Sequence, residues 1–169
     1  GLICMEVDEL LSLQVIFNIF RQKLITELLP QARANGTGII VRLPVASGLL
    51  SGKFTKDTTF PENDQRNFNS DGQRFNVGET FAGLPFQKGV ELAGKIKEYV
   101  PEGMTMAQMA LRWILDHEAV SVVIPGASKV EQAKQNAAAS ELPPLPGSLH
   151  KTLSELYEDQ VKEHIRGRY

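Results

Sequence analysis

Three short runs of apolar residues, separated by segments with helical periodicity, constrain the fold of this chain more than any other feature of its sequence. The runs cover residues 11–20, 38–42 and 119–126. Apolar residues dominate all three runs, which is typical of strands buried on both faces of a parallel sheet. The alternation of such strands with helices predicts an α/β fold with a thin, three-stranded parallel sheet.

The helices are predicted from the spacing of apolar residues between these runs. They are expected at residues 25–36, 84–100, 105–117, 128–140 and 148–167. Gly36 is expected to end the first of them. Thr105 and Gln108 match a capping box at the start of another. The apolar face that follows predicts core packing, not a cofactor site, and comprises Met106, Met109, Ala110, Trp113 and Ile114.

Residues 54–85 form a long polar stretch that is rich in Gly, Asn and Asp. Phenylalanines recur along it, at Phe54, Phe60, Phe68, Phe75 and Phe81. Loops of this length are usually functional or disordered. Regularly placed aromatic side chains favour a loop that docks on the protein surface over a disordered one.

Composition narrows the classes of partner and compartment. The formal net charge of -2 argues against a nucleic-acid partner, which needs a basic surface. The single cysteine, Cys4, excludes an intrachain disulfide and indicates a reducing compartment. The first residues, "GLICMEVDELL", lack the basic segment of a signal peptide, and no apolar run is long enough to span a bilayer. We therefore expect a cytoplasmic protein with no membrane partner.

A candidate ligand site follows the third apolar run. Pro125 and Gly126 end that run, and Ser128 with Glu131 matches the S-x-x-E pattern of a capping box. The simplest interpretation is a helix cap and nothing more. The alternative is an anion site, because a helix N-terminus presents free N–H groups and the positive end of its dipole. Side chains that would serve such a site are Lys129, Gln132, Gln135 and Asn136.

Other polar residues carry weaker signals. Arg42 lies inside an apolar strand and is expected to need an anionic partner. The small-residue turn after it leads to Lys53, but Gly48 and Gly52 are one residue too close together for a phosphate-binding P-loop. The histidines show no paired spacing, which predicts surface or capping roles and no metal site. They are His117, His150 and His164.

Several segments, taken in order, resemble the aldo-keto reductases. They are "LQVIFNIFRQ", "RLPVASGLLSGK", "DQRNFN", "FNVGETFAGLPF", "TMAQMALRWIL" and "VVIPGASKVEQAKQN". That family folds as a (β/α)8 TIM barrel and reduces carbonyls with NADPH. The resemblance is to the C-terminal half of the family and runs from about Leu13 to the end, where "EHIRGRY" is similar to a family C-terminus. It implies a partial barrel of about three C-terminal βα units plus a C-terminal helix, in one domain.

The resemblance also implies a set of NADPH-binding residues. Gln14 would hold the nicotinamide carboxamide, and Arg42 stands where many members stack an aromatic ring on the nicotinamide. Arg66, in the long 54–85 loop, would cover the cofactor. The pyrophosphate would lie on Leu43, Pro44, Val45, Ala46 and Ser47, with Lys53 nearby. The adenosine and its 2′-phosphate would lie on Gly126, Ser128, Lys129, Gln132, Gln135 and Asn136.

No residue of the chain matches the family's catalytic tyrosine, lysine, aspartate and histidine. Tyr99, Tyr157 and Tyr169 do not stand in the catalytic context, and hydride delivery to a carbonyl needs an acid for the developing alkoxide. We therefore expect a truncated, NADP(H)-binding portion of a reductase, which acts on a carbonyl substrate only if the other half is supplied. The alternative is a non-catalytic nucleotide-binding or assembly fragment that self-associates through open sheet edges. An unrelated small α/β protein is the third possibility.

Overall fold

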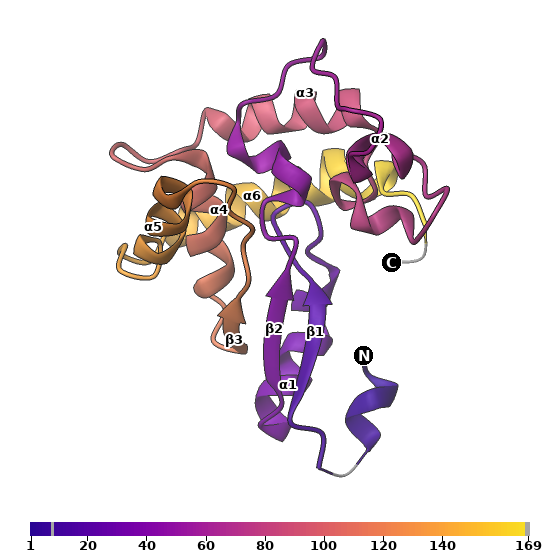
Figure 1. Cartoon of the computed structure of the whole chain (residues 1–169). Helices are drawn as coiled ribbons and strands as arrows, with labels where there is room; N and C mark the ends of the chain where they lie inside the picture. The colour runs from indigo at the N-terminus through magenta and orange to yellow at the C-terminus, as the bar shows by residue number, and fades with distance from the viewer. Residues whose placement is uncertain (8, 168–169) are drawn as a thin grey trace.

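The protein is built on a parallel sheet of three strands. The computed structural model describes residues 1–7 and 9–167. Strands β1 (Ser12–Ile16), β2 (Gly38–Arg42) and β3 (Val120–Val123) lie in the order β1-β2-β3, and both pairings are parallel. Figure 1 shows the strands side by side, with their carboxyl ends directed toward most of the helices. The predicted parallel α/β fold is confirmed, and β2 has the expected bounds.

Six α-helices are described, and all but the one at residues 65–68, which lies in the expected long loop, fall on predicted segments and are shorter than predicted. They are α1 (Leu28–Asn35), α2 (Gln65–Phe68), α3 (Phe86–Lys97), α4 (Met106–Leu115), α5 (Val130–Ala138) and α6 (Gly147–Leu156). The expected terminal helix is interrupted after α6 by a π-helical turn, Tyr157–Val161, and a 3-10 turn, Lys162–His164. Within the described ranges, no helix combines the length and the apolar character that crossing a bilayer requires.

Local sequence signals account for the helix ends. Gly36 ends α1 in the left-handed region, with φ of 70°, where a glycine avoids a steric cost. The Thr105 side chain accepts a hydrogen bond from the Gln108 backbone N–H, and the Gln108 side chain returns to the Thr105 N–H, so the predicted capping box is confirmed. The predicted apolar face of α4 is buried, including Trp113 at 1% exposure.

The first apolar run is a strand over only half of its length. The prediction of a strand throughout residues 11–20 is wrong after Ile16, because the chain turns there. The Asn18 side chain accepts a hydrogen bond from the Phe20 N–H at 3.0 Å, and the Arg21 N–H donates to the Asn18 carbonyl at 2.8 Å. This turn sends Phe17 and Phe20 into the core, where both are fully buried. The apolar residues after Ile16 therefore pack in the core and do not extend the strand.

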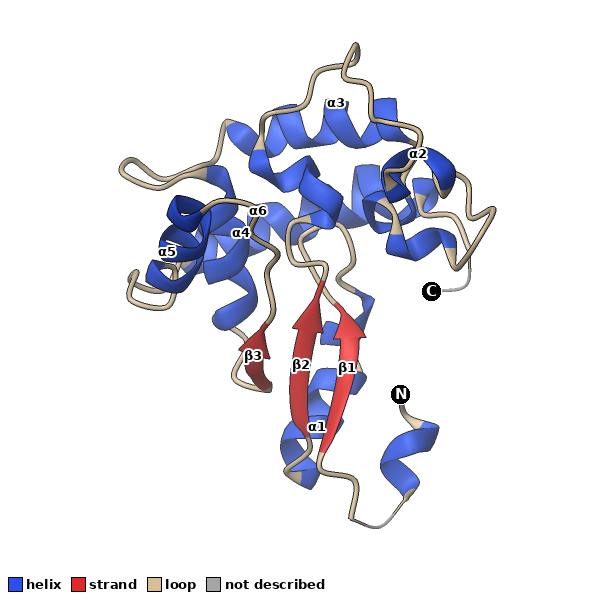
Figure 2. Cartoon of the chain, in the orientation of Figure 1, coloured by secondary structure: helices blue, strands red, loops and turns tan. Residues whose placement is uncertain are grey.

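Within the described residues, only one face of the sheet is covered by the rest of the chain. Ile39 and Val41 of β2 are fully buried, while Ile40, on the opposite face, pairs in register with Gln14 of β1 and Val122 of β3. Gln14 is exposed and Val122 is 44% exposed. The prediction of strands buried on both faces is therefore wrong for this structure. Strands β1 and β3 are also both edge strands (Figure 2).

Residues 54–85 dock on the rest of the protein through aromatic contacts. Phe54 and Phe60 lie with ring centroids 5.3 Å apart, and Phe60 continues to Phe81 at 5.7 Å. Phe81 in turn lies 5.0 Å from Phe86, at the start of α3. The segment also contains α2 and two 3-10 turns. These contacts agree with the expectation that the aromatic side chains hold the loop in place.

Two of the histidines are only partly exposed, and His117 has the capping role that was one of the two expectations, at the end of α4. The His117 ring packs 4.7 Å from Trp113 and 5.0 Å from Phe17. Burial lowers the pKa of His117, while a hydrogen bond to the Trp113 carbonyl partly offsets that effect. His150 lies 2.9 Å from a carboxylate oxygen of Asp116, whose side chain is almost fully buried. These residues join α4 to α6, which sequence spacing alone does not reveal.

Candidate functional site

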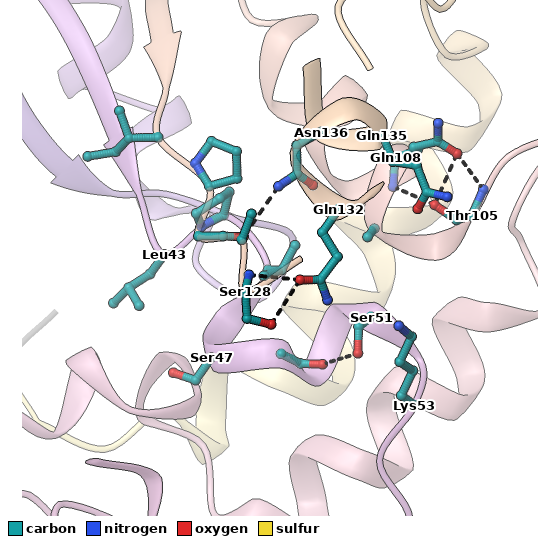
Figure 3. A pocket seen from close by; sticks show the side chains of 18 of the residues that line it. Leu43, Ser47, Ser51, Lys53, Thr105, Gln108, Ser128, Gln132, Gln135 and Asn136 are labelled. Carbon is teal, nitrogen blue, oxygen red and sulfur yellow. Dashed lines mark hydrogen bonds between the residues drawn. The ribbon is translucent and has the colours of Figure 1, made fainter. Parts of the chain in front are cut away.

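A cavity of about 650 Å³ lies beyond the carboxyl ends of β2 and β3. Its walls come from the segment after β2, the start of α4, the β3–α5 connection and α5, as Figure 3 shows. Most of the residues expected to bind a cofactor line it. They are Leu43, Pro44, Val45, Ser47, Lys53, Arg66, Gly126, Ser128, Gln132, Gln135 and Asn136. Four distant segments therefore converge on one cavity, in the place where parallel α/β proteins bind ligands.

Other residues of the cavity wall were not among those predicted to bind a cofactor. They include Gly48, Ser51, Phe54, Thr105, Gln108 and Ile124. Gly48 has φ of 101°, and a Cβ atom there would lie 2.8 Å from the Phe54 ring. The absence of a side chain at Gly48 therefore lets the Phe54 ring pack against the turn after β2. The start of α4 carried a cap signal, but nothing in its sequence indicated that the cap faces a cavity.

The start of α5 is not capped as predicted. The helix begins at Val130, and Ser128 lies outside it, so the Ser128–Glu131 capping box is wrong. The Gln132 amide oxygen takes that place. It accepts hydrogen bonds from the Ser128 N–H at 2.9 Å, the Ser128 hydroxyl at 3.0 Å and the Lys129 N–H at 3.1 Å (Figure 3). The donors expected to meet an anion thus converge on a neutral oxygen of the protein itself.

The cations that line the cavity come from the segment after β2 and from the long loop, not from α5. Lys129 is exposed and does not line the cavity, whereas Lys53 and Arg66 do. Arg66 donates to Asp64 through Nε at 2.9 Å and Nη2 at 2.6 Å, and its guanidinium lies 4.4 Å from the Phe60 ring centroid. The hydrogen bonds to Asp64 raise the pKa of Arg66. Among the described residues, Lys53 is the lining cation with no carboxylate within ion-pair distance.

The turn after β2 presents an unusual backbone to the cavity. Leu43, Ala46 and Ser47 have φ of 54°, 48° and 56°, in the left-handed region that costs a non-glycine residue about 1–2 kcal/mol. The buried Asn18 side chain donates to the Leu43 carbonyl at 2.9 Å. Ala46 is fully buried below the turn and does not line the cavity. Such strain persists where surrounding contacts hold it, and it is concentrated at ligand sites.

Gln14 and Arg42, expected at the nicotinamide, do not line the cavity. They lie on the open face of the sheet, because Gln14 pairs with Ile40 and Arg42 is two residues further along β2. Arg42 forms a bidentate ion pair with Glu79, in which Nη2 and Oε1 are 2.5 Å apart. This hydrogen bonding raises the pKa of Arg42. The expectation that Arg42 needs an anionic partner is confirmed. The residues predicted to bind the cofactor are divided between the cavity and the open face of the sheet.

The tyrosines of the described chain lie away from the cavity. Tyr99 is 42% exposed after α3, and Tyr157 is buried at the end of α6. Tyr169 lies outside the described residues. In the part of the chain that the structure describes, no three His, Cys, Asp or Glu side chains gather as a metal site would require.

Comparison with known sequences adds a family match to this geometry. The sequence model of the Aldo/keto reductase family matches residues 3–158. The match therefore begins before Leu13 and ends before "EHIRGRY", unlike the expected resemblance. A probable voltage-gated potassium channel subunit beta from Arabidopsis thaliana is 28% identical over 158 residues, 90% of this chain and 43% of that protein. An L-glyceraldehyde 3-phosphate reductase from Escherichia coli O157:H7 is 34% identical over 117 residues, 66% of this chain and 31% of that protein.

Solved structures show the same fold. A glycerol dehydrogenase from Gluconobacter oxydans superposes with a TM-score of 0.69 at 24% identity, over 94% of this chain and 45% of that one. An aldo/keto reductase from Klebsiella pneumoniae, in complex with NADP and acetate, has a TM-score of 0.52 at 21% identity, over 87% of this chain and 39% of that one. The chain thus spans less than half the length of each of these four proteins.

Proposed function

This chain belongs to the aldo/keto reductase family, and from that premise we propose that it forms the NADP(H)-binding portion of a reductase that converts a carbonyl to an alcohol. The observation that carries the proposal is the cavity, which collects residues from segments far apart in the sequence. Its volume of about 650 Å³ falls within the usual range for cofactor sites. The Klebsiella pneumoniae relative in complex with NADP supports the choice of cofactor.

The cavity walls suit the different parts of a dinucleotide. Lys53 and the backbone of the turn after β2 would take the pyrophosphate, and Arg66 would cover it from the long loop. The start of α5 would take the adenosine and its 2′-phosphate, once the Gln132 side chain gives up the Ser128 and Lys129 donors. The nicotinamide, the part of the cofactor that exchanges hydride, would extend toward Gln14 and Arg42 on the sheet face.

The reaction itself needs a proton donor beside the carbonyl oxygen. We assign that role to no described residue of this chain, because Tyr99 and Tyr157 lie away from the cavity. The proposal is therefore a partial (β/α)8 barrel whose catalytic residues and carbonyl pocket are contributed by the other strands of the barrel. The open edges of β1 and β3 are where such strands would pair.

A second candidate function is assembly without catalysis. The supporting observation is the uncovered sheet face, where Val122 is 44% exposed beside the open edge of β3. Unpaired parallel edges with apolar residues favour association with another chain. This candidate predicts stable oligomers of the chain that bind no cofactor.

The deciding experiment is a fluorescence titration of the chain with NADPH, run beside size-exclusion chromatography. We expect saturable binding, and an approximately fivefold higher Kd for Lys53→Gln, the effect of losing one exposed ion pair. Lys56→Gln is the matched control, because Lys56 is exposed in the same segment and does not line the cavity. Absence of NADPH binding, together with a defined oligomer, would refute the cofactor role and favour assembly.

A further inference from the structure

A short segment of the long loop, residues 77–83, presses against the turn that carries the cavity wall; we name it the strap. It consists of two 3-10 turns, Val77–Glu79 and Phe81–Gly83. Phe81 and Ala82 have φ of 52° and 59°, and both are buried. The strap is therefore a second strained segment, and it lies against the first one, the turn after β2.

Hydrogen bonds fasten the strap to that turn. The Ser47 hydroxyl donates to the Glu79 carbonyl at 3.3 Å and accepts from the Phe81 N–H at 3.0 Å. On another side, Arg21 donates to the Ala82 carbonyl at 3.4 Å, and a Cβ atom on Gly78 would lie only 2.2 Å from the Arg21 guanidinium. The close approach of Gly78 to the Arg21 guanidinium and these hydrogen bonds hold the strap against the turn after β2.

The strap carries Glu79, whose carboxylate pairs with the Arg42 guanidinium. Glu79 meets Arg42 through both carboxylate oxygens, and the two side chains are 26% and 32% exposed. Arg42 is the last residue of β2, immediately before the cavity-lining Leu43, and it shares the open sheet face with Gln14. Where the cavity meets the open sheet face, Glu79 therefore neutralises the positive charge of Arg42.

We propose that Glu79 is a positioning residue that sets the balance between oxidised and reduced cofactor, by orienting Arg42 and neutralising its charge beside the nicotinamide. This inference rests on the proposed function. The oxidised nicotinamide ring carries a positive charge and the reduced ring carries none. A bare guanidinium would repel only the oxidised ring, whereas the Arg42–Glu79 pair presents a planar and nearly neutral surface to both.

The test compares three ligands on four proteins. NADP+, NADPH and 2′,5′-ADP, which lacks the nicotinamide, are titrated against the unmodified chain, Glu79→Gln, Glu79→Asp and Glu62→Gln. Glu62 is an exposed glutamate of the same loop and serves as the matched control. For Glu79→Gln we expect the Kd of NADP+ to rise about tenfold and that of NADPH less than about twofold, because only the oxidised ring meets an uncompensated charge. Binding of 2′,5′-ADP should not change, and Glu79→Asp should restore most of the NADP+ affinity.

The outcomes separate this inference from its premise. If the unmodified chain binds none of the three ligands, the proposed function fails, and the inference fails with it. If 2′,5′-ADP binds but Glu79→Gln leaves the NADP+ to NADPH ratio unchanged, or weakens all three ligands equally, the inference alone is overturned. A double variant, Arg42→Gln with Glu79→Gln, covers the case in which the single variant folds poorly. It removes both charges, and we expect its ratio to return close to that of the unmodified chain.

Discussion

Arg166 holds the long loop in place, and its removal gives the sharpest prediction about stability. Its guanidinium donates to the carbonyls of Gly83 at 3.0 Å, Ser70 at 2.8 Å and Leu84 at 3.2 Å. A further bond reaches the Asp71 carboxylate at 2.5 Å and lowers the pKa of Asp71. One side chain near the C-terminus thus joins both ends of the segment between α2 and α3.

The expected cost of Arg166→Met follows from these four bonds. Methionine keeps an apolar side chain of similar length but removes every donor. A hydrogen bond contributes about 0.5–1.5 kcal/mol, and bonds to charged groups contribute more when they are buried. The Arg166 side chain is 32% exposed, so water replaces part of the loss. We therefore expect the free energy of unfolding to fall by about 2–4 kcal/mol.

Urea denaturation measures the fall, and hydrogen exchange locates it. Exchange should accelerate in peptides covering residues 69–84 and change little in β2 and α4, because the lost bonds all hold the loop. Arg74→Met is the control, since Arg74 is an exposed arginine of the same loop. A fall below about 0.5 kcal/mol, no larger than that of an ordinary surface substitution, would refute the view that Arg166 carries the loop.

Two further predictions concern the cavity turn and pH. Gly48→Ala should destabilise the chain by about 1–3 kcal/mol, because φ of 101° strains alanine and its Cβ meets the Phe54 ring; thermal unfolding measures the loss, and an unchanged melting temperature would contradict it. The pKa of folded His117 lies below its ordinary value of about 6.5. The unfolded chain therefore binds more protons, and stability should decline as pH falls through and below about 6.5. His117→Gln should flatten that part of a urea-midpoint profile against pH, and a profile as steep as before would contradict the assignment.

Local patterns in the sequence predicted those elements whose causes are local. The β2 run, the Gly36 stop and the Thr105 cap each depend on residues within a few positions of one another. The 11–20 run was overextended because continuous apolar character does not distinguish a strand from a turn that enters the core. Ser128 was misassigned as a cap because Gln132, one position after Glu131, accepts the Ser128 N–H that Glu131 was expected to bind.

Contacts between residues far apart in the sequence could not be predicted, for a different reason. Glu79 meets Arg42 from 37 positions away, and Arg166 meets Gly83 from 83 positions away. Neither pair has a motif, and an isolated glutamate or arginine resembles any solvated residue. The cavity was easier to predict, because strand order alone places the segments after β2 and β3 at one edge of the sheet.

At the start of α5, the Gln132 side chain occupies the hydrogen-bond donors that a ligand would need. A ligand that reaches this point has to displace an oxygen that already satisfies three donors. Chloride or free phosphate would exchange one set of bonds for another and gain little. Under the proposed function, a dinucleotide would spread the cost of displacement over contacts along the whole cavity, so the helix end would discriminate by ligand size as well as by charge.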